Sequence, residues 1–284
     1  MPKSTENEMT VEAIWRKYLT TGQLPYSKAP FGLTYPTFKR FMHHMPSDPR
    51  CTLCNVPFEG IGAPVVRALT GRTRSRMNPN LCNVCEQFAQ EHQGGAEVEL
   101  SMLFADIRGS TRLAHSMSAA EYSQRISRFY RVTADILIDV YALIEKLIGD
   151  EVAGLFVPGV AGQDHARKAV EASQAILRAT GHGNGGEPRV PVGIGVHTGV
   201  AFVGSVGSEE GVSTITALGD AVNITARLAS AAGPGEVLVS EATSHAARLD
   251  SAGLEARRLS LKGLEEPTDV HVLGADTSTV FLVD

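Results

Sequence analysis

Asp106 lies where a carboxylate could bind a metal ion close to phosphate groups. It follows the apolar residues 102–105 and precedes the small residues 109–111, which read Gly-Ser-Thr. The apolar run predicts a buried strand, and the small residues predict a turn into a helix. Carboxylate oxygens are hard ligands for a divalent cation, and the N–H groups of such a turn can bind phosphate oxygens. This combination indicates a site for a polyphosphate and its metal ion.

A second carboxylate, Asp150, follows Gly149 between two apolar runs. This pattern predicts a hairpin with Asp150 at its tip. Taken alone, each aspartate is more typical of a turn than of a ligand, but together they would lie where neighbouring strands end. Two cations held about 4 Å apart can activate a hydroxyl group and stabilise a leaving pyrophosphate.

Several helices are expected to position these groups. Ser118 and Glu121 form a capping-box pattern that predicts the start of a long amphipathic helix. In a second helix, predicted over residues 221–232, Asn223 and Arg227 are four residues apart and therefore share one face. An arginine in this position could offset charge that develops on a phosphoryl group, although an ordinary surface pair is the alternative.

Two strands are predicted over residues 190–196 and 199–207, joined by a turn at His197. We interpret His197 as a turn residue that satisfies hydrogen bonds, because this role is more common for a histidine at such a place than catalysis.

The cysteines form two C-x2-C pairs in the N-terminal third, separated by a long spacer. This segment has few large apolar residues, so a metal could stabilise a small loop-rich module. The pattern predicts a structural zinc site with four thiolate ligands, Cys51, Cys54, Cys82 and Cys85. An iron–sulfur cluster, a thiol redox switch and four unrelated thiols are the alternatives. The basic residues between the pairs are interpreted as an exposed loop: Arg72, Arg74 and Arg76.

The composition is that of an ordinary globular protein, with 284 residues and a net charge of −5. No apolar run approaches the ~20 residues of a membrane span, and the N-terminus has no signal-peptide core, so we expect a cytoplasmic protein. No interleaved aromatic and basic residues accompany the cysteines, which argues against a nucleic-acid partner. The expected organisation is a cysteine-rich module over 1–95, a catalytic domain over 96–274 and a tail over 275–284.

Five motifs occur in one order over residues from about 98 to 274. They are LFADIRGST, KLIGD (146–150), GVHTGV (195–200), TxxGDxVNxxxR (216–227) and LKG (261–263). Their order and spacing resemble the class III nucleotidyl cyclase domain, which makes cyclic AMP or cyclic GMP. The resemblance implies an α+β fold with a ferredoxin-like βαββαβ core and extra strands.

The resemblance also implies a role for each matching residue. Asp106 and Asp150 match the aspartates that bind two Mg²⁺ or Mn²⁺ ions, with the carbonyl group of Ile107 as a further ligand. Asn223 matches the asparagine that orients the ribose, and Arg227 the arginine that stabilises the transition state. The residues implied to bind the substrate at the strand exit are Ile107, Gly109, Ser110 and Thr111.

The resemblance also implies which nucleotide base is recognised, through two further positions. Lys146 matches the lysine that favours adenine, where guanine-specific members carry glutamate. Thr216 stands where many members have an aspartate. Threonine at this position resembles a bacterial subgroup that still makes cyclic AMP, and its hydroxyl can donate to or accept from the base. The sequence departs from the pattern at Leu264, where some members have a phosphate-binding lysine; Lys262 is the replacement we expect.

In this family the site forms between two domains, so one domain per chain implies a head-to-tail homodimer with two sites. The implied reaction is attack of the ribose 3′-hydroxyl of ATP on the α-phosphorus, with pyrophosphate leaving.

The cysteine pairs resemble a segment that precedes some bacterial cyclase domains, and a regulatory role is our hypothesis for it. The alternatives are a guanylate cyclase and a non-catalytic cyclase-like sensor. A diguanylate cyclase also shares the turn at Asp150 but lacks the helix with Asn223 and Arg227.

Overall fold

The chain divides into two compact units. The first comprises Met1–Val98, Pro158–Val160 and Phe202–Ala217, and the second comprises Glu99–Val157, Ala161–Ala201 and Leu218–Asp284. The computed structural model describes residues 9–23, 35–45, 50–51, 53–75, 81–183, 188–207, 213–263 and 266–282. Among the helices in these residues, none combines the length and apolar character needed to cross a membrane.

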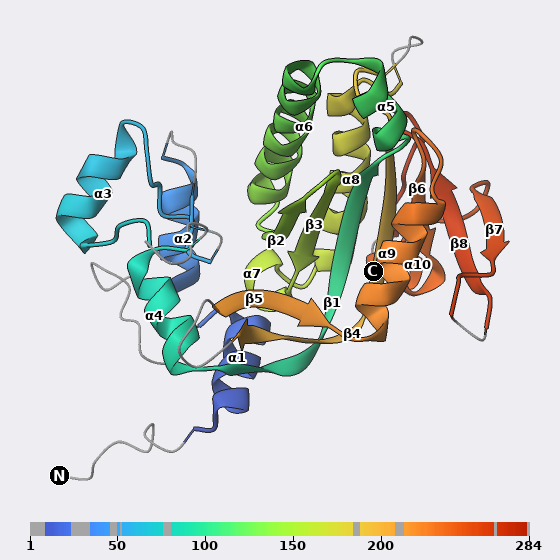
Figure 1. The fold of residues 1–284 in the computed structure, drawn as a ribbon. Helices are drawn as coiled ribbons and strands as arrows, with labels where there is room; N and C mark the ends of the chain where they lie inside the picture. The colour runs from blue at the N-terminus through green and yellow to red at the C-terminus, as the bar shows by residue number, and fades with distance from the viewer. Residues whose placement is uncertain are drawn as a thin grey trace. The chain divides into compact units, whose positions relative to one another are not determined.

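The described part of the first unit contains four helices before the sheet begins. They are α1 (Val11–Thr21), α2 (Tyr35–His43), α3 (Gly62–Thr70) and α4 (Asn83–Glu91) (Figure 1). Helix α1 begins where the Thr10 side chain accepts a hydrogen bond from the Ala13 N–H, as expected for an N-cap. Its buried face includes Trp15, whose Nε1 donates to the carbonyl of His92 at 2.8 Å and so joins α1 to the end of α4.

A mixed sheet with helices organises the rest of the chain. Its elements are β1 (Gly94–Ile107), α5 (Ser110–Ser116), α6 (Ala119–Asp139), β2 (Leu143–Ile148), β3 (Glu151–Phe156), α7 (Pro158–Ala161), α8 (His165–Thr180), β4 (Val192–Gly207), β5 (Ser213–Leu218), α9 (Asp220–Ala231), β6 (Val237–Ser240), α10 (Glu241–Ala247), β7 (Glu255–Leu259) and β8 (Thr268–Leu273). The predicted capping box at Ser118 is confirmed at the start of α6.

The strand order confirms the predicted fold. The sheet runs β2-β3-β1-β4-β6-β8-β7, and β5 pairs with β4. Strands β1 and β3 are antiparallel, with Ala105 opposite Val152, whereas β4 and β6 are parallel, with Ile194 opposite Val237. The sequence β1-α6-β2-β3-α8-β4 with spatial order β2-β3-β1-β4 is the ferredoxin-like βαββαβ core. The remaining strands extend this core at its β4 side.

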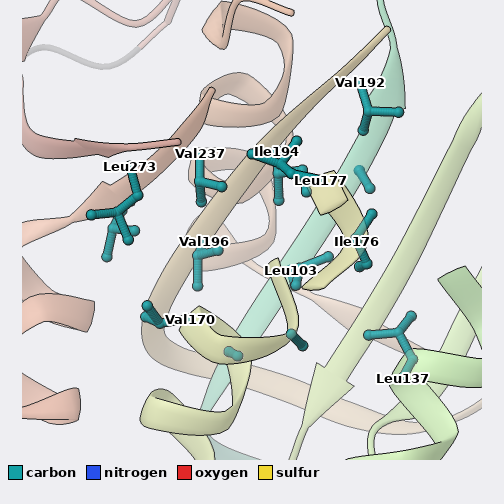
Figure 2. Packing of buried hydrophobic residues seen from close by; sticks show 14 of the residues in the cluster. Leu103, Leu137, Val170, Ile176, Leu177, Val192, Ile194, Val196, Val237 and Leu273 are labelled. Carbon is teal, nitrogen blue, oxygen red and sulfur yellow. The ribbon is translucent and has the colours of Figure 1, made fainter. Parts of the chain in front are cut away.

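The two faces of the sheet in the second unit bury different sets of apolar side chains. On one face, strand residues such as Leu103, Ile194 and Val237 join a large cluster with α6 and α8 (Figure 2). On the other face, Leu238 packs with Leu228 of α9. Since successive strand residues point to opposite faces, Val237 and Leu238 belong to different clusters. The alternation therefore fixes α9 on the face opposite α8.

Two glycines of β4 allow α9 to lie directly against the strand. A Cβ atom on Gly195 would lie 2.3 Å from the backbone nitrogen of Ala229 and 2.6 Å from the carbonyl oxygen of Thr225. A Cβ atom on Gly193 would lie 2.7 Å from the carbonyl oxygen of Ala232. No real Cβ atom fits at such distances, so these glycines set the position of the helix that carries Asn223 and Arg227.

The predicted turn at His197 is wrong, because β4 continues through this position as one strand. Gly199, which suggested the turn, has another reason to be glycine: a Cβ atom there would lie 3.1 Å from the Cβ of Ala221 on α9. The His197 ring is buried, and its Nδ1 lies 2.8 Å from the hydroxyl of Ser240. His197 is therefore a hydrogen-bonded core residue of the sheet.

Burial of His197 predicts a pH-dependent contribution to stability. Burial lowers its pKa from 6.5 to about 4. Between these values the unfolded chain binds a proton that the folded chain does not, so the free energy of unfolding falls as the pH is lowered from 6.5 to 4. The loss is at most ~3 kcal/mol and is absent above pH 6.5. In urea unfolding, His197→Gln should flatten this pH dependence. An unchanged slope between pH 6.5 and 4 would contradict the assignment.

Candidate active site

Asp106 and Asp150 lie at the same end of the sheet in the second unit. Asp106 is opposite Glu151 in the β1–β3 ladder, one residue before the end of β1. Asp150 is in the turn between β2 and β3, and its carbonyl oxygen accepts a hydrogen bond from the Ile107 N–H at 3.0 Å. The ladder and this hydrogen bond hold the two aspartates on neighbouring chain segments, as the sequence predicted from the strand exit and the hairpin.

The charges around Asp106 suit a bound cation. Burial raises the pKa of its carboxyl group; the ion pair with Arg108 opposes this shift, and the charge of Asp150 adds to it. Two half-buried carboxylates that repel each other are stabilised by a shared positive charge. As hard oxygen donors on partly exposed side chains, Asp106 and Asp150 fit divalent magnesium or manganese. The carbonyl of Ile107 is still only a predicted ligand.

Tyr130 of α6 fixes the turn that carries Asp150, a role the sequence did not reveal. Its hydroxyl donates to the carbonyl oxygen of Gly149 at 2.8 Å, and Gly149 has a φ of 65°, which favours glycine. Burial and the charge of Asp150 both raise the pKa of Tyr130. In the sequence, this role could be inferred only from a polar group on a helix face that otherwise packs against the core.

Removing this hydroxyl should weaken catalysis without unfolding the protein. Tyr130→Phe keeps the ring but frees the Gly149 carbonyl, and one such hydrogen bond contributes about 1 kcal/mol. We expect kcat to fall about threefold to tenfold at saturating nucleotide and metal. Tyr122→Phe, which alters another tyrosine of the same helix, is the control. Equal kcat values for the two variants would exclude a positioning role for Tyr130.

The turn after Asp106 also connects to α9. Gly109 adopts a φ of 66° immediately before α5. The backbone N–H of Arg108 donates to the carbonyl of Pro191 at 2.7 Å, and its side-chain Nη1 donates to the carbonyl of Ser230 at 2.9 Å. Arg108 therefore ties the end of β1 to the last turn of α9. The predicted substrate-binding residues Gly109, Ser110 and Thr111 follow in this turn, and Gly109 and Thr111 are exposed.

Asn223 and Arg227 lie one turn apart on α9, with Asn223 exposed and Arg227 partly buried. A Cβ atom on Gly263, the residue after the exposed Lys262, would lie 3.2 Å from Nη2 of Arg227. Leu264 lies outside the described residues. In the part of the chain that the structure describes, no hydrogen bond or ion pair joins Asn223 or Arg227 to Asp106 or Asp150.

The two residues predicted to read the base belong to different strands. Thr216 is buried on β5 in the first unit. Lys146 is on β2, opposite Ala153, and its side chain lies outside the described residues. Base recognition by these two residues therefore stays a prediction.

The cysteines of the first unit gather into one buried cluster. The Sγ atoms of all four lie within 4.8 Å of one another, so together they could hold a metal ion. The Cys82 N–H donates to Cys51 Sγ at 3.3 Å, and the Cys85 N–H donates to Cys82 Sγ at 3.5 Å. Hydrogen bonds from the Cys51 and Cys54 thiols hold the pKa of Cys82 well below its ordinary value. The prediction that the two pairs share one site is confirmed; the identity of the metal is not.

The interpretation of Arg72 as part of an exposed loop is wrong. Arg72 is 6% exposed, and its guanidinium faces the cysteine sulfurs. Arg74, two residues later, is exposed as expected, and Arg76 lies outside the described residues. Arg72 and Arg74 look alike in the sequence, although one is buried and the other exposed.

Comparison with known proteins identifies the catalytic part of the chain. The sequence model of the family described as "Adenylate and Guanylate cyclase catalytic domain" matches residues 93–276. An adenylate cyclase of Anabaena cylindrica is 32% identical over 135 residues, which are 45% of this chain and 26% of that protein. An uncharacterised protein of Mycobacterium tuberculosis is 30% identical over 184 residues, 63% of this chain and 34% of that protein. The matched regions are about a quarter to a third of the length of these relatives.

Solved structures with the same fold include cyclases of both specificities. The guanylyl cyclase Cya2 superimposes with a TM-score of 0.57 at 26% identity, over 63% of this chain and 93% of that one. The adenylyl cyclase CyaB from P. aeruginosa superimposes with a TM-score of 0.54 at 25% identity, over 62% of this chain and 94% of that one. These likenesses support a nucleotidyl cyclase without deciding the base.

Proposed function

Since the chain belongs to the adenylate and guanylate cyclase catalytic domain family, we propose that it converts ATP to 3′,5′-cyclic AMP and pyrophosphate. The observation that carries this proposal is the meeting of Asp106 and Asp150 at the end of β1 and at the β2–β3 turn. The two positions match the metal-binding aspartates of the family, and both side chains are partly exposed, which supports a role in binding a metal–nucleotide complex.

Each candidate site residue has a defined role in this proposal. Asp106, Asp150 and the Ile107 carbonyl would hold two Mg²⁺ or Mn²⁺ ions. When bound, such ions activate the ribose 3′-hydroxyl and stabilise the leaving pyrophosphate. Gly109, Ser110 and Thr111 would bind phosphate oxygens through backbone N–H groups and hydroxyls.

The residues of α9 act on the other parts of the nucleotide. Asn223 would orient the ribose, so that the 3′-hydroxyl points at the α-phosphorus. Arg227 would offset the negative charge that develops on the phosphoryl oxygens, and Lys262 would bind the triphosphate.

We assign ATP as substrate on the basis of Lys146 and Thr216. The test compares kcat/KM for ATP and GTP in the full-length chain. We expect ATP to be preferred by at least about tenfold, and Lys146→Glu to lower that preference by a similar factor. Lys17→Glu reverses a charge on α1 and should leave the ratio unchanged. Faster turnover of GTP by the unaltered chain would make it a guanylate cyclase.

Because the sites of this family form between two domains and one such domain is matched in this chain, we infer a head-to-tail homodimer with shared sites. Asp106→Ala and Arg227→Ala should each be inactive alone. When the two are mixed and allowed to exchange subunits, half of the dimers carry one intact site. Activity should then return to about a quarter of that of the unaltered chain. No recovery in exchanged dimers would contradict shared sites.

The N-terminal part would serve as a regulatory module with structural zinc at Cys51, Cys54, Cys82 and Cys85. We retain the boundaries 1–95 for this module, 96–274 for the catalytic domain and 275–284 for the tail. None of the four cysteines forms a disulfide bond, and this supports a cytoplasmic location. Nothing in the composition calls for a nucleic-acid partner.

A further inference from the structure

The distances between the cysteine sulfurs suit one metal ion. Zinc binds thiolates at about 2.3 Å, so the edges of a regular tetrahedron of sulfurs are ~3.8 Å long. Cys54 Sγ and Cys82 Sγ are 3.7 Å apart, and all four sulfurs lie within 4.8 Å of one another. In a four-iron cluster each cysteine binds a different iron atom, which requires sulfurs that are farther apart. The spacing therefore favours a single tetrahedral ion.

A buried arginine contacts three of these sulfurs. Nη1 of Arg72 lies 3.6 Å from the Sγ atoms of Cys54 and Cys82 and 3.8 Å from that of Cys85. Its guanidinium also lies over the Phe38 ring, 5.2 Å from the centroid. Arginine is always charged in proteins, and a buried charge needs a compensating partner. Thiolates, unlike neutral thiols, provide one.

A second buried cation lies in the same part of the first unit. Lys39 is 4% exposed, and in the described part of the chain its Nζ has no hydrogen-bond partner. Lys39 directly follows Phe38, whose ring lies under the Arg72 guanidinium, so the two cations come from adjoining parts of one module. Burial lowers the pKa of Lys39 to about 8, and the charges of Cys54 and Cys51 oppose this shift. An ammonium group without a partner is costly to bury unless negative charge lies nearby.

The charges of these groups balance when a divalent ion is bound. Four thiolates around such an ion carry a net charge of −2, and Arg72 and Lys39 together carry +2. We propose that Arg72 and Lys39 are the counter-charges of a single-ion, four-thiolate metal site formed by the four cysteines. This rests on the zinc site of the proposed function, but it is independent of cyclase activity.

The test measures metal binding by the full-length chain. The unaltered protein should contain one zinc per chain by elemental analysis. Exchange with Co²⁺ should give the visible absorption of a tetrahedral cobalt thiolate. Zinc affinity is then compared by chelator competition. Arg72→Met should bind zinc at least about tenfold more weakly, since partners of metal ligands typically contribute a factor of 10 to 100.

Two further variants keep the test decisive if Arg72→Met does not fold. Lys39→Met removes the second charge and should also weaken zinc binding, and Arg72→Lys should restore part of the affinity. Arg74→Met is the matched control, because Arg74 is exposed in the same segment and pairs with Glu59. The proposal is overturned if the chain binds neither Zn²⁺ nor Co²⁺, if it contains iron with acid-labile sulfide, or if the variants at 39 and 72 bind zinc as tightly as Arg74→Met. Loss of cyclase activity alone would leave these results unaffected.

Discussion

Replacing Asp106 by Asn should lower cyclic-nucleotide formation by about 10³-fold, on the order of 4 kcal/mol in transition-state stabilisation. The substitution keeps the shape of the side chain and the β1–β3 pairing, so the fold should persist. It removes one of the two negative charges at the sheet end. Metal held by Asp150 alone cannot serve both the attacking hydroxyl and the leaving group.

The measurement is the initial rate of product formation at saturating ATP and Mn²⁺, with circular dichroism to verify folding. Asp164→Asn is the control, because Asp164 is an exposed carboxylate that pairs with Lys168 of α8. It should retain the rate of the unaltered chain. Asp106→Asn with a rate within a few fold of that control would show that Asp106 does not hold a catalytic ion.

Replacing Gly195 by Ala should lower both stability and activity. The added Cβ atom would lie 2.3 Å from the Ala229 nitrogen, which belongs to the helix backbone and cannot rotate away. Overpacking of this kind typically costs 1–3 kcal/mol, and we expect about 2 kcal/mol here. Because α9 carries Asn223 and Arg227, a displacement of about 1 Å should also lower kcat by ~100-fold.

Urea unfolding and initial rates measured on the same preparation separate the two effects. Gly274→Ala is the control, since its nearest neighbour would be the Thr277 hydroxyl at an ordinary 3.5 Å. It should behave like the unaltered chain. If Gly195→Ala matched Gly274→Ala in both measurements, the close approach of α9 to β4 would not position the site.

The sequence predicted those parts of the site that depend on local patterns. An apolar run ending in Asp106 and a glycine before Asp150 are enough to predict a strand exit and a hairpin. The four-residue spacing of Asn223 and Arg227 is enough to place them on one helix face. The two C-x2-C pairs likewise predict that the four cysteines come together, because two thiols from each pair complete one tetrahedral site.

The parts that the sequence did not predict depend on contacts between distant segments. The hydrogen bond from Tyr130 to Gly149 joins a helix to a hairpin, and no spacing rule connects them. Arg72 resembles its neighbour Arg74 in sequence, and only the folded module distinguishes the buried arginine from the exposed one. The prediction of a turn at His197 fails for the same reason. Gly199 is needed because Ala221 of α9 packs close to it, and the strand does not bend there.

The most direct test of the account is the reaction itself. The full-length chain is incubated with ATP or GTP and either Mn²⁺ or Mg²⁺, and cyclic nucleotide and pyrophosphate are quantified together. We expect 3′,5′-cyclic AMP and pyrophosphate in equal amounts from ATP, both lost in Asp106→Asn. A folded, dimeric chain that releases no cyclic nucleotide from either substrate with either ion would contradict it.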